Sequence, residues 1–164
     1  MSDALPVVIR GIAPGEEAAV SALVDTVFRH DVAPVYAPDG VAEFLRYATE
    51  AGLRDRRARG HVILVALQGD SLVGMLEMRM YAHISLLFVD RARQRQGIGR
   101  ALVGKALELC QAQSSPAAEI TVNSSPNAVN AYRRIGFRET GEPQVRNGIG
   151  FVPMSLPLNR ANSA

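Results

Sequence analysis

Residues 94–103 limit the folds open to this chain more than any other stretch, because they place glycines and arginines between an apolar run and an amphipathic helix. They read Gln-Arg-Gln-Gly-Ile-Gly-Arg-Ala-Leu-Val and follow the alternating segment 84–89. The first N–H groups of a helix have no intrahelical partner, and the helix dipole adds partial positive charge there. Gly97 and Gly99 have no Cβ, so an anion can approach the backbone closely. The stretch therefore predicts a strand, a loop and a helix start that hold phosphate.

Two familiar nucleotide motifs do not match this loop. A P-loop needs a Lys-Ser/Thr pair after its last glycine, whereas Gly99 is followed by Arg100 and Ala101. A dinucleotide fingerprint needs a third glycine where Leu102 stands, and it normally follows the first strand of its domain. The remaining form is Gln94-x-x-Gly97-x-Gly99, for which a simple glycine turn before a helix is the alternative.

A second segment downstream also joins a strand to a helix. Residues 118–123, Ala-Glu-Ile-Thr-Val-Asn, predict a short strand. Ser125 is a candidate N-cap, and Pro126 suits the first helical position. The helix is expected over 127–135, with Gly136 ending it before Phe137.

Together the two segments resemble the acetyl-CoA-binding segments of the GNAT superfamily of N-acetyltransferases. The second reads Asn123-x-x-Pro126-Asn127-x-x-Asn130-x-Tyr132-x-x-x-Gly136-Phe137. The resemblance extends over about residues 5–158 and is strongest over 81–137. It implies an α/β (α+β) fold: a mostly antiparallel sheet of six to seven strands, splayed between 83–89 and 118–123, with helices on both faces. The length of 164 residues predicts one domain, 1–164, and the small polar residues 159–164 are expected to form a frayed tail.

The resemblance implies acetyl-CoA as the acyl donor and assigns residues to it. Main-chain groups near a bulge at the end of strand 83–89 would hold the pantetheine arm. The same side chains are equally expected in a core. The arginines around the loop, Arg91, Arg93, Arg95 and Arg100, suit the phosphates, because guanidinium groups recognise such oxygens. The implied coenzyme-binding residues are Leu87, Phe88, Val89, Gln94, Arg95, Gln96, Gly97, Ile98, Gly99, Arg100, Asn123, Asn127, Asn130 and Tyr132.

Tyr132 is the residue expected to take part in catalysis. The resemblance places it beside the thioester, where the departing sulfur needs a hydrogen-bond donor. Proton transfer from an ordinary phenol, with a pKa of about 10, to a thiolate with a pKa of about 8.5 is uphill by about 2 kcal/mol. Tyr132 is therefore expected to act mainly as a donor to developing charge, the alternative being a lowered pKa. A second alternative is a core aromatic in the stripe formed with Ala128 and Ile135.

Glu77 and His83 are the two candidates for the base that deprotonates the amine, acting through a water. A lysine-like amine with a pKa of about 10.4 is only about one part in 10³ neutral at pH 7. The alternatives are a surface glutamate paired with Arg79 and an ordinary histidine at a strand end.

The rest of the pattern predicts alternating helices and strands in one domain. The expected first helix follows Pro14 and has an apolar face through Val20 and Val27, and a second helix carries Phe44 and Ala51 after a break at 34–40. Gln68-Gly69-Asp70-Ser71 suits a hairpin-like turn. Strands are expected at 7–11, 61–67, 72–80, 83–89, 118–123, 137–140 and 150–158.

Composition and charge exclude several classes of function and partner. A formal charge of +2 without aromatic residues among the arginines of 91–100 argues against nucleic acid. No apolar run approaches a membrane span and no signal-peptide pattern begins the chain, so no membrane contact is expected. Cys110 is the only cysteine, so no internal disulfide forms and a cytoplasmic location is expected. Cys110 is expected to be a small apolar residue, and no metal site is expected.

These features favour a GNAT-like enzyme that moves an acetyl group to a primary amine by direct attack in a ternary complex. The alternative is an acyl-CoA-binding sensor or interaction module without turnover. The acceptor, a small-molecule or peptide amine, is left open, with Asp31 a candidate partner for a cationic amine or a local cap. Homodimers occur among similar proteins, although nothing in these residues demonstrates one.

Overall fold

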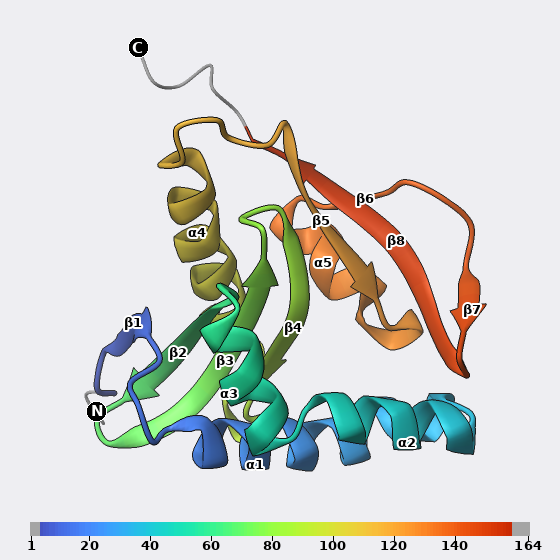
Figure 1. Ribbon diagram of the computed structural model, residues 1–164, viewed down its shortest axis with the longest axis horizontal. Coiled ribbons are helices and arrows are strands. Elements are labelled where there is room, and N and C mark those ends of the chain that lie inside the picture. The colour runs from blue at the N-terminus through green and yellow to red at the C-terminus, as the bar shows by residue number, and fades with distance from the viewer. Residues whose placement is uncertain (1–3, 159–164) are drawn as a thin grey trace.

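One mixed sheet organises the protein (Figure 1), described here by a computed structural model over residues 4–158. The strand order is β1-β2-β3-β4-β5-β8-β6, with β7 paired to β8. All neighbours are antiparallel except β4 and β5, which run parallel. The strands are β1 (Val7–Gly11), β2 (Val62–Gln68), β3 (Ser71–Arg79), β4 (His83–Val89), β5 (Glu119–Ser124), β6 (Arg138–Glu139), β7 (Gln144–Arg146) and β8 (Ile149–Pro157).

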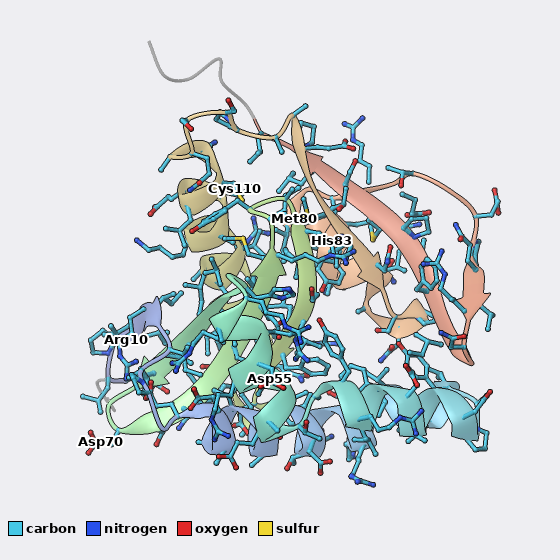
Figure 2. The ribbon with its side chains drawn as sticks, in the orientation of Figure 1. Arg10, Asp55, Asp70, Met80, His83 and Cys110 are labelled. Atoms are coloured by element: carbon cyan, nitrogen blue, oxygen red, sulfur yellow. The ribbon has the colours of Figure 1, made fainter. Side chains whose placement is uncertain are left out.

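Helices cover both faces of this sheet, as expected from the resemblance. The α-helices are α1 (Glu17–Val27), α2 (Pro38–Tyr47), α3 (Glu50–Ala58), α4 (Ile98–Gln111) and α5 (Val129–Ile135). Buried residues of α4 and α5 pack on one face, around Leu76 and Ile120, whereas those of α1 and α3 pack on the other, around Val65 and Met75. Cys110 lies in the first of these cores, with its side chain on the sheet side of α4 (Figure 2).

The structure corrects three expectations about the elements. The single second helix is two helices, α2 and α3, because the side chain of Thr49 accepts a hydrogen bond from the Gly52 N–H (3.0 Å) and starts a new helix. The sheet has eight strands rather than six to seven, because it includes the short strand β7, which was not expected. Ser125 does not cap a helix with its side chain, and a 3₁₀ turn, Pro126–Ala128, precedes α5. The expected tail, 159–164, lies outside the described residues.

The sheet opens between its two parallel strands. β4 and β5 pair only at His83↔Thr121 and Ile84↔Val122, and beyond these positions they separate along their length (Figure 1). The pairing register of β3 and β4 shifts by one residue at Ser85, which marks a β-bulge. The resemblance implied a bulge at the end of this strand, but the bulge lies near the start of β4. The edge of β4 from Ser85 to Val89 is left without a β5 partner.

None of the helices between residues 4 and 158 combines the length and apolar character needed to cross a membrane.

Candidate functional site

A cavity of about 880 Å³ lies where β4 and β5 separate. It is lined by the length of β4, by the loop before α4, by the first turns of α5 and by α2. The hairpin of β7 and β8 completes the wall. The predicted site residues that line it are His83, Leu87, Phe88, Val89, Gln94, Arg95, Gly97, Ile98, Gly99, Arg100, Asn123, Asn127, Asn130 and Tyr132, whereas Glu77 and Gln96 do not.

The start of α4 forms one end of this cavity. Gly97 is the N-cap residue, with a left-handed φ of 84°, and Arg95 before it also has a positive φ, of 63°. A Cβ on Gly97 would meet nothing within 4 Å, so the space beside this backbone is open. Because no side chain caps the helix, its first N–H groups stay available to an anion. This geometry agrees with the strand, loop and helix expected from residues 94–103.

Arginines surround the same end, but not all those expected. Arg93, Arg95 and Arg100 line the cavity, and Arg134 joins them from α5. Arg100 also donates a hydrogen bond to the Arg134 carbonyl oxygen (2.5 Å). Arg91 instead pairs with Asp31, with 3.3 Å between Nε and Oδ1.

Asp31 links the loop to a distant part of the chain. It lies in a π-helical turn, Phe28–Val32, that continues α1. Its carboxylate accepts hydrogen bonds from Arg91 and from Gln94 (3.0 Å), and its carbonyl oxygen accepts one from Asn127 (2.6 Å). Burial alone would raise the pKa of Asp31, yet hydrogen bonds from Gln94 and His30, with the charge of Arg91, lower it. Asp31 is therefore ionised, and its hydrogen bonds connect the loop before α4 with Asn127 across the cavity.

Tyr132, on α5, lines the cavity. Its ring packs edge-on against Phe137 (5.3 Å between centroids), and only 8% of the residue is exposed. Burial, and to a lesser extent the nearby Tyr36, raise the pKa of the Tyr132 phenol well above its usual value. The phenol thus keeps its proton at neutral pH. Within residues 4–158 its hydroxyl has no hydrogen-bond partner.

His83 lies at the start of β4, in the space toward β5 (Figure 2). Its Nδ1 is 2.7 Å from the Thr121 hydroxyl, which itself donates to the Ala82 carbonyl oxygen (3.4 Å). When the hydroxyl proton goes to the Ala82 carbonyl oxygen, Nδ1 donates to the Thr121 oxygen, and in this tautomer Nε2 carries the free lone pair. Burial and the charge of Arg79 lower the pKa of His83 to about 4. The imidazole is therefore neutral at pH 7.

Glu77 occupies a different environment from the expected one. It is fully buried on β3 and pairs with Arg56 of α3 through two hydrogen bonds, of 2.7 and 3.0 Å, rather than with Arg79. His61 Nδ1 is 2.8 Å from the same carboxylate. Both oxygens are thus occupied outside the cavity, which excludes the alternative of a surface glutamate paired with Arg79.

The network around Glu77 reaches the cavity wall through Tyr47. The guanidinium of Arg56 lies 3.6 Å from the Tyr47 ring centroid and donates to the Tyr47 carbonyl oxygen (2.7 Å). The Tyr47 side chain also hydrogen-bonds Ser85 at the bulge of β4. Sequence reasoning missed Tyr47 because its partners lie in three separate elements. It also missed Arg134 as a cavity residue, and it considered Arg79 only as a partner of Glu77.

Within residues 4–158 no three His, Cys, Asp or Glu side chains gather in a way that could hold a metal ion. Cys110 is buried, and burial raises the pKa of its thiol.

Comparison with known proteins shows which protein family this domain matches. The model of the acetyltransferase (GNAT) domain family matches residues 32–158. An uncharacterized N-acetyltransferase of Methanocaldococcus jannaschii is 34% identical over 68 residues, 41% of this chain and 30% of that protein. The chain spans 30 to 55% of the length of the curated relatives it matches.

Solved structures share the fold at low sequence identity. A GCN5-related N-acetyltransferase from Rhodopseudomonas palustris superimposes with a TM-score of 0.80 at 20% identity, over 96% of this chain and 99% of that one. The PaiA N-acetyltransferase of Thermoplasma acidophilum, solved in complex with coenzyme A, gives 0.74 at 15% identity, over 92% and 98%. At such identities the likeness establishes the α+β architecture with its mixed, mostly antiparallel sheet.

Proposed function

The chain belongs to the acetyltransferase (GNAT) family, and we propose that it transfers the acetyl group of acetyl-CoA to a primary amine by direct attack, with both substrates in one cavity. We propose that residues 1–164 act as one catalytic domain. The observation that carries the proposal is that the open start of α4 and the Tyr132 phenol face the same cavity.

The residues at the start of α4 fit the diphosphate of coenzyme A. The uncapped N–H groups after Gly97, the open space beside it and the arginines Arg93, Arg95 and Arg100 offer donors and positive charge together. The PaiA N-acetyltransferase, which shares this fold, was solved in complex with coenzyme A. Gln94, held by Asp31, would keep the loop in place.

The free edge of β4 fits the pantetheine arm. Leu87, Phe88 and Val89 line the cavity along the part of β4 that has no β5 partner. Backbone amides there are available to the amide groups of the arm, as the edge of a sheet offers unpaired donors and acceptors. On the other side we assign Asn123, Asn127 and Asn130 to the coenzyme.

Tyr132 is proposed to hydrogen-bond the departing sulfur. Acetyl-CoA supplies a thioester carbon, which forms a bond to the amine nitrogen while the carbon–sulfur bond breaks. The raised pKa keeps the phenol protonated, and no group within residues 4–158 competes for its hydroxyl. Both facts favour a donor to developing charge over an ionised phenol.

His83 is proposed as the base that takes the amine proton. Its neutral imidazole lines the cavity and, in the tautomer protonated at Nδ1, offers the Nε2 lone pair, whereas the Glu77 carboxylate is occupied by Arg56 and His61. A covalent acyl-enzyme through Cys110 is disfavoured, because that thiol is buried under α4 with a raised pKa. This supports direct attack of the amine on the thioester.

Release of free coenzyme A from acetyl-CoA in the presence of a panel of amines tests the proposal. Tyr132→Phe should slow acetyl transfer by roughly 10²- to 10⁴-fold while calorimetry shows nearly unchanged coenzyme affinity. Tyr81→Phe is the matched control, since Tyr81 does not line the cavity. Equal turnover by the Tyr132 variant would refute its role. Binding of acetyl-CoA without turnover of any amine would favour a non-catalytic acyl-CoA sensor.

A further inference from the structure

Two arginines line the cavity away from the start of α4, and neither has an acidic partner within residues 4–158. They are Arg79, at the end of β3, and Arg146, on β7. We propose that the acceptor is a small amine that also carries a carboxylate, drawn to these two guanidinium groups. The inference rests on the proposed acetyl transfer and specifies its substrate class.

The acids on the cavity wall are already occupied. Glu43 pairs with Arg46 (2.5 Å), and Asp31 pairs with Arg91 and Gln94. A polycationic acceptor would therefore meet two uncompensated arginines and no free carboxylate. The charges on the described wall favour an acceptor with an anionic group.

Arg79 lies far from the expected diphosphate position. In the β3–β4 register Arg79 is opposite His83, at the start of β4. The loop that precedes α4 follows Val89, at the other end of β4. Six steps along a strand cover roughly 20 Å. Arg93, Arg95 and Arg100 are present at the α4 end. Arg79 is therefore free for the acceptor.

Arg146 is held in the β7–β8 hairpin, which forms part of the cavity wall. Its guanidinium lies 5.7 Å from the Phe151 ring centroid, which is a cation–π arrangement. The tip of the hairpin packs against the start of α2, where the backbone of Gly148 lies close to Gly40. This packing fixes the hairpin that carries Arg146, so part of a carboxylate site is in place before the acceptor binds.

A carboxylate beside Arg79 would also help the base. The charge of Arg79 contributes to the low pKa of His83. An anion bound there would offset that charge and raise the pKa of His83 toward its ordinary value, which brings the base closer to neutral pH. An acceptor with a carboxylate would thus make His83 a better base as it binds.

The test compares amino acids with matched molecules that lack the carboxylate. Alanine, leucine and phenylalanine are each paired with their amides, and phenylalanine also with 2-phenylethylamine, and kcat/KM is measured from coenzyme A release. An amide's amine has a pKa of about 8 and is more often neutral, so chemistry alone favours the amides. We expect the amino acids to be preferred at least tenfold.

Charge-neutral variants connect that preference to the two side chains. Arg146→Gln and Arg79→Gln should each lower kcat/KM for amino acids about 10- to 100-fold and move the amino acid/amide ratio toward one. Arg79→Gln should also shift the acidic limb of the pH profile upward, as His83 loses a neighbouring cation. Arg59→Gln is the control, because this exposed arginine does not line the cavity and should keep the wild-type ratio.

Two results would overturn the inference while leaving the proposed function intact: amides or 2-phenylethylamine acetylated as well as the amino acids, or a ratio that neither variant changes. If no amine in the panel releases coenzyme A, the proposed acetyl transfer itself fails, and the inference with it.

Discussion

The substitution Glu77→Gln tests whether the Glu77 carboxylate stabilises the fold or acts as the catalytic base. Glu77 is fully buried, and two hydrogen bonds from Arg56 and one from His61 hold its carboxylate. The neutral amide would leave the Arg56 guanidinium, whose side chain is only 12% exposed, without a counter-ion. Breaking a buried pair from one side costs about 3 to 5 kcal/mol. For a chain of this length that loss lowers Tm by about 6 to 20 °C.

Thermal unfolding followed by circular dichroism measures this loss, and Glu50→Gln is its matched control. Glu50 pairs with Arg54 on the surface of the same helix α3, where an i,i+4 ion pair contributes less than about 1 kcal/mol. If the two variants lose the same stability, the reasoning about a buried pair is refuted.

Kinetics of the same variant well below its Tm test the catalytic alternative. A structural Glu77 predicts that kcat per folded molecule changes less than tenfold, whereas a general base predicts a loss of roughly 10²- to 10⁴-fold. The double variant Arg56→Met with Glu77→Leu removes both charges and should recover part of the stability. If this double variant recovers stability but loses kcat, Glu77 is again a candidate for the catalytic base.

Two further outcomes follow from the geometry. Gly40→Ala should lower Tm by about 2 to 12 °C, because a Cβ there overlaps the Gly148 carbonyl group, whereas Gly104→Ala, in a helix with open space, should not lower it. His83, with a folded pKa of about 4 against about 6.5 when unfolded, binds fewer protons in the native state, so the free energy of unfolding should fall as pH drops from 6.5 toward 4. Urea denaturation across that range should show a flatter dependence for His83→Gln, and parallel curves would contradict the assignment.

The parts of the site that sequence predicted are those set by local backbone demands. Gly97 and Gly136 both adopt left-handed φ, of 84° and 119°, one at the start of α4 and one at the end of α5. Such positions favour glycine whatever the tertiary context. The strand over 83–89 and the separation of its partner were likewise predicted, the latter through the family resemblance.

The partners of charged residues could not be predicted in the same way. Glu77 and Arg79 share a strand face, which made their pairing plausible, yet the partner of Glu77 is Arg56, 21 residues earlier on a helix. The partners of Asp31 follow it by about 60 residues, since Arg91 and Gln94 come from the loop before α4. Such contacts depend on how α1 and α3 pack across the sheet. The periodicity of apolar residues along the chain does not predict how these helices pack across the sheet.

These long-range pairs also explain how one cavity can serve two substrates of different chemistry. Asp31 and Glu43 neutralise arginines beside the cavity, while Arg93, Arg95 and Arg100 at the α4 end and Arg79 and Arg146 elsewhere on the wall stay without acidic partners within residues 4–158. Unpaired positive charge therefore lines the cavity both at the α4 end and away from it, with the neutral Tyr132 and His83 on the wall as well. The proposed anions, the coenzyme diphosphate and the acceptor carboxylate, would each bind at such an arginine and bring the thioester and the amine into the cavity that these two side chains line.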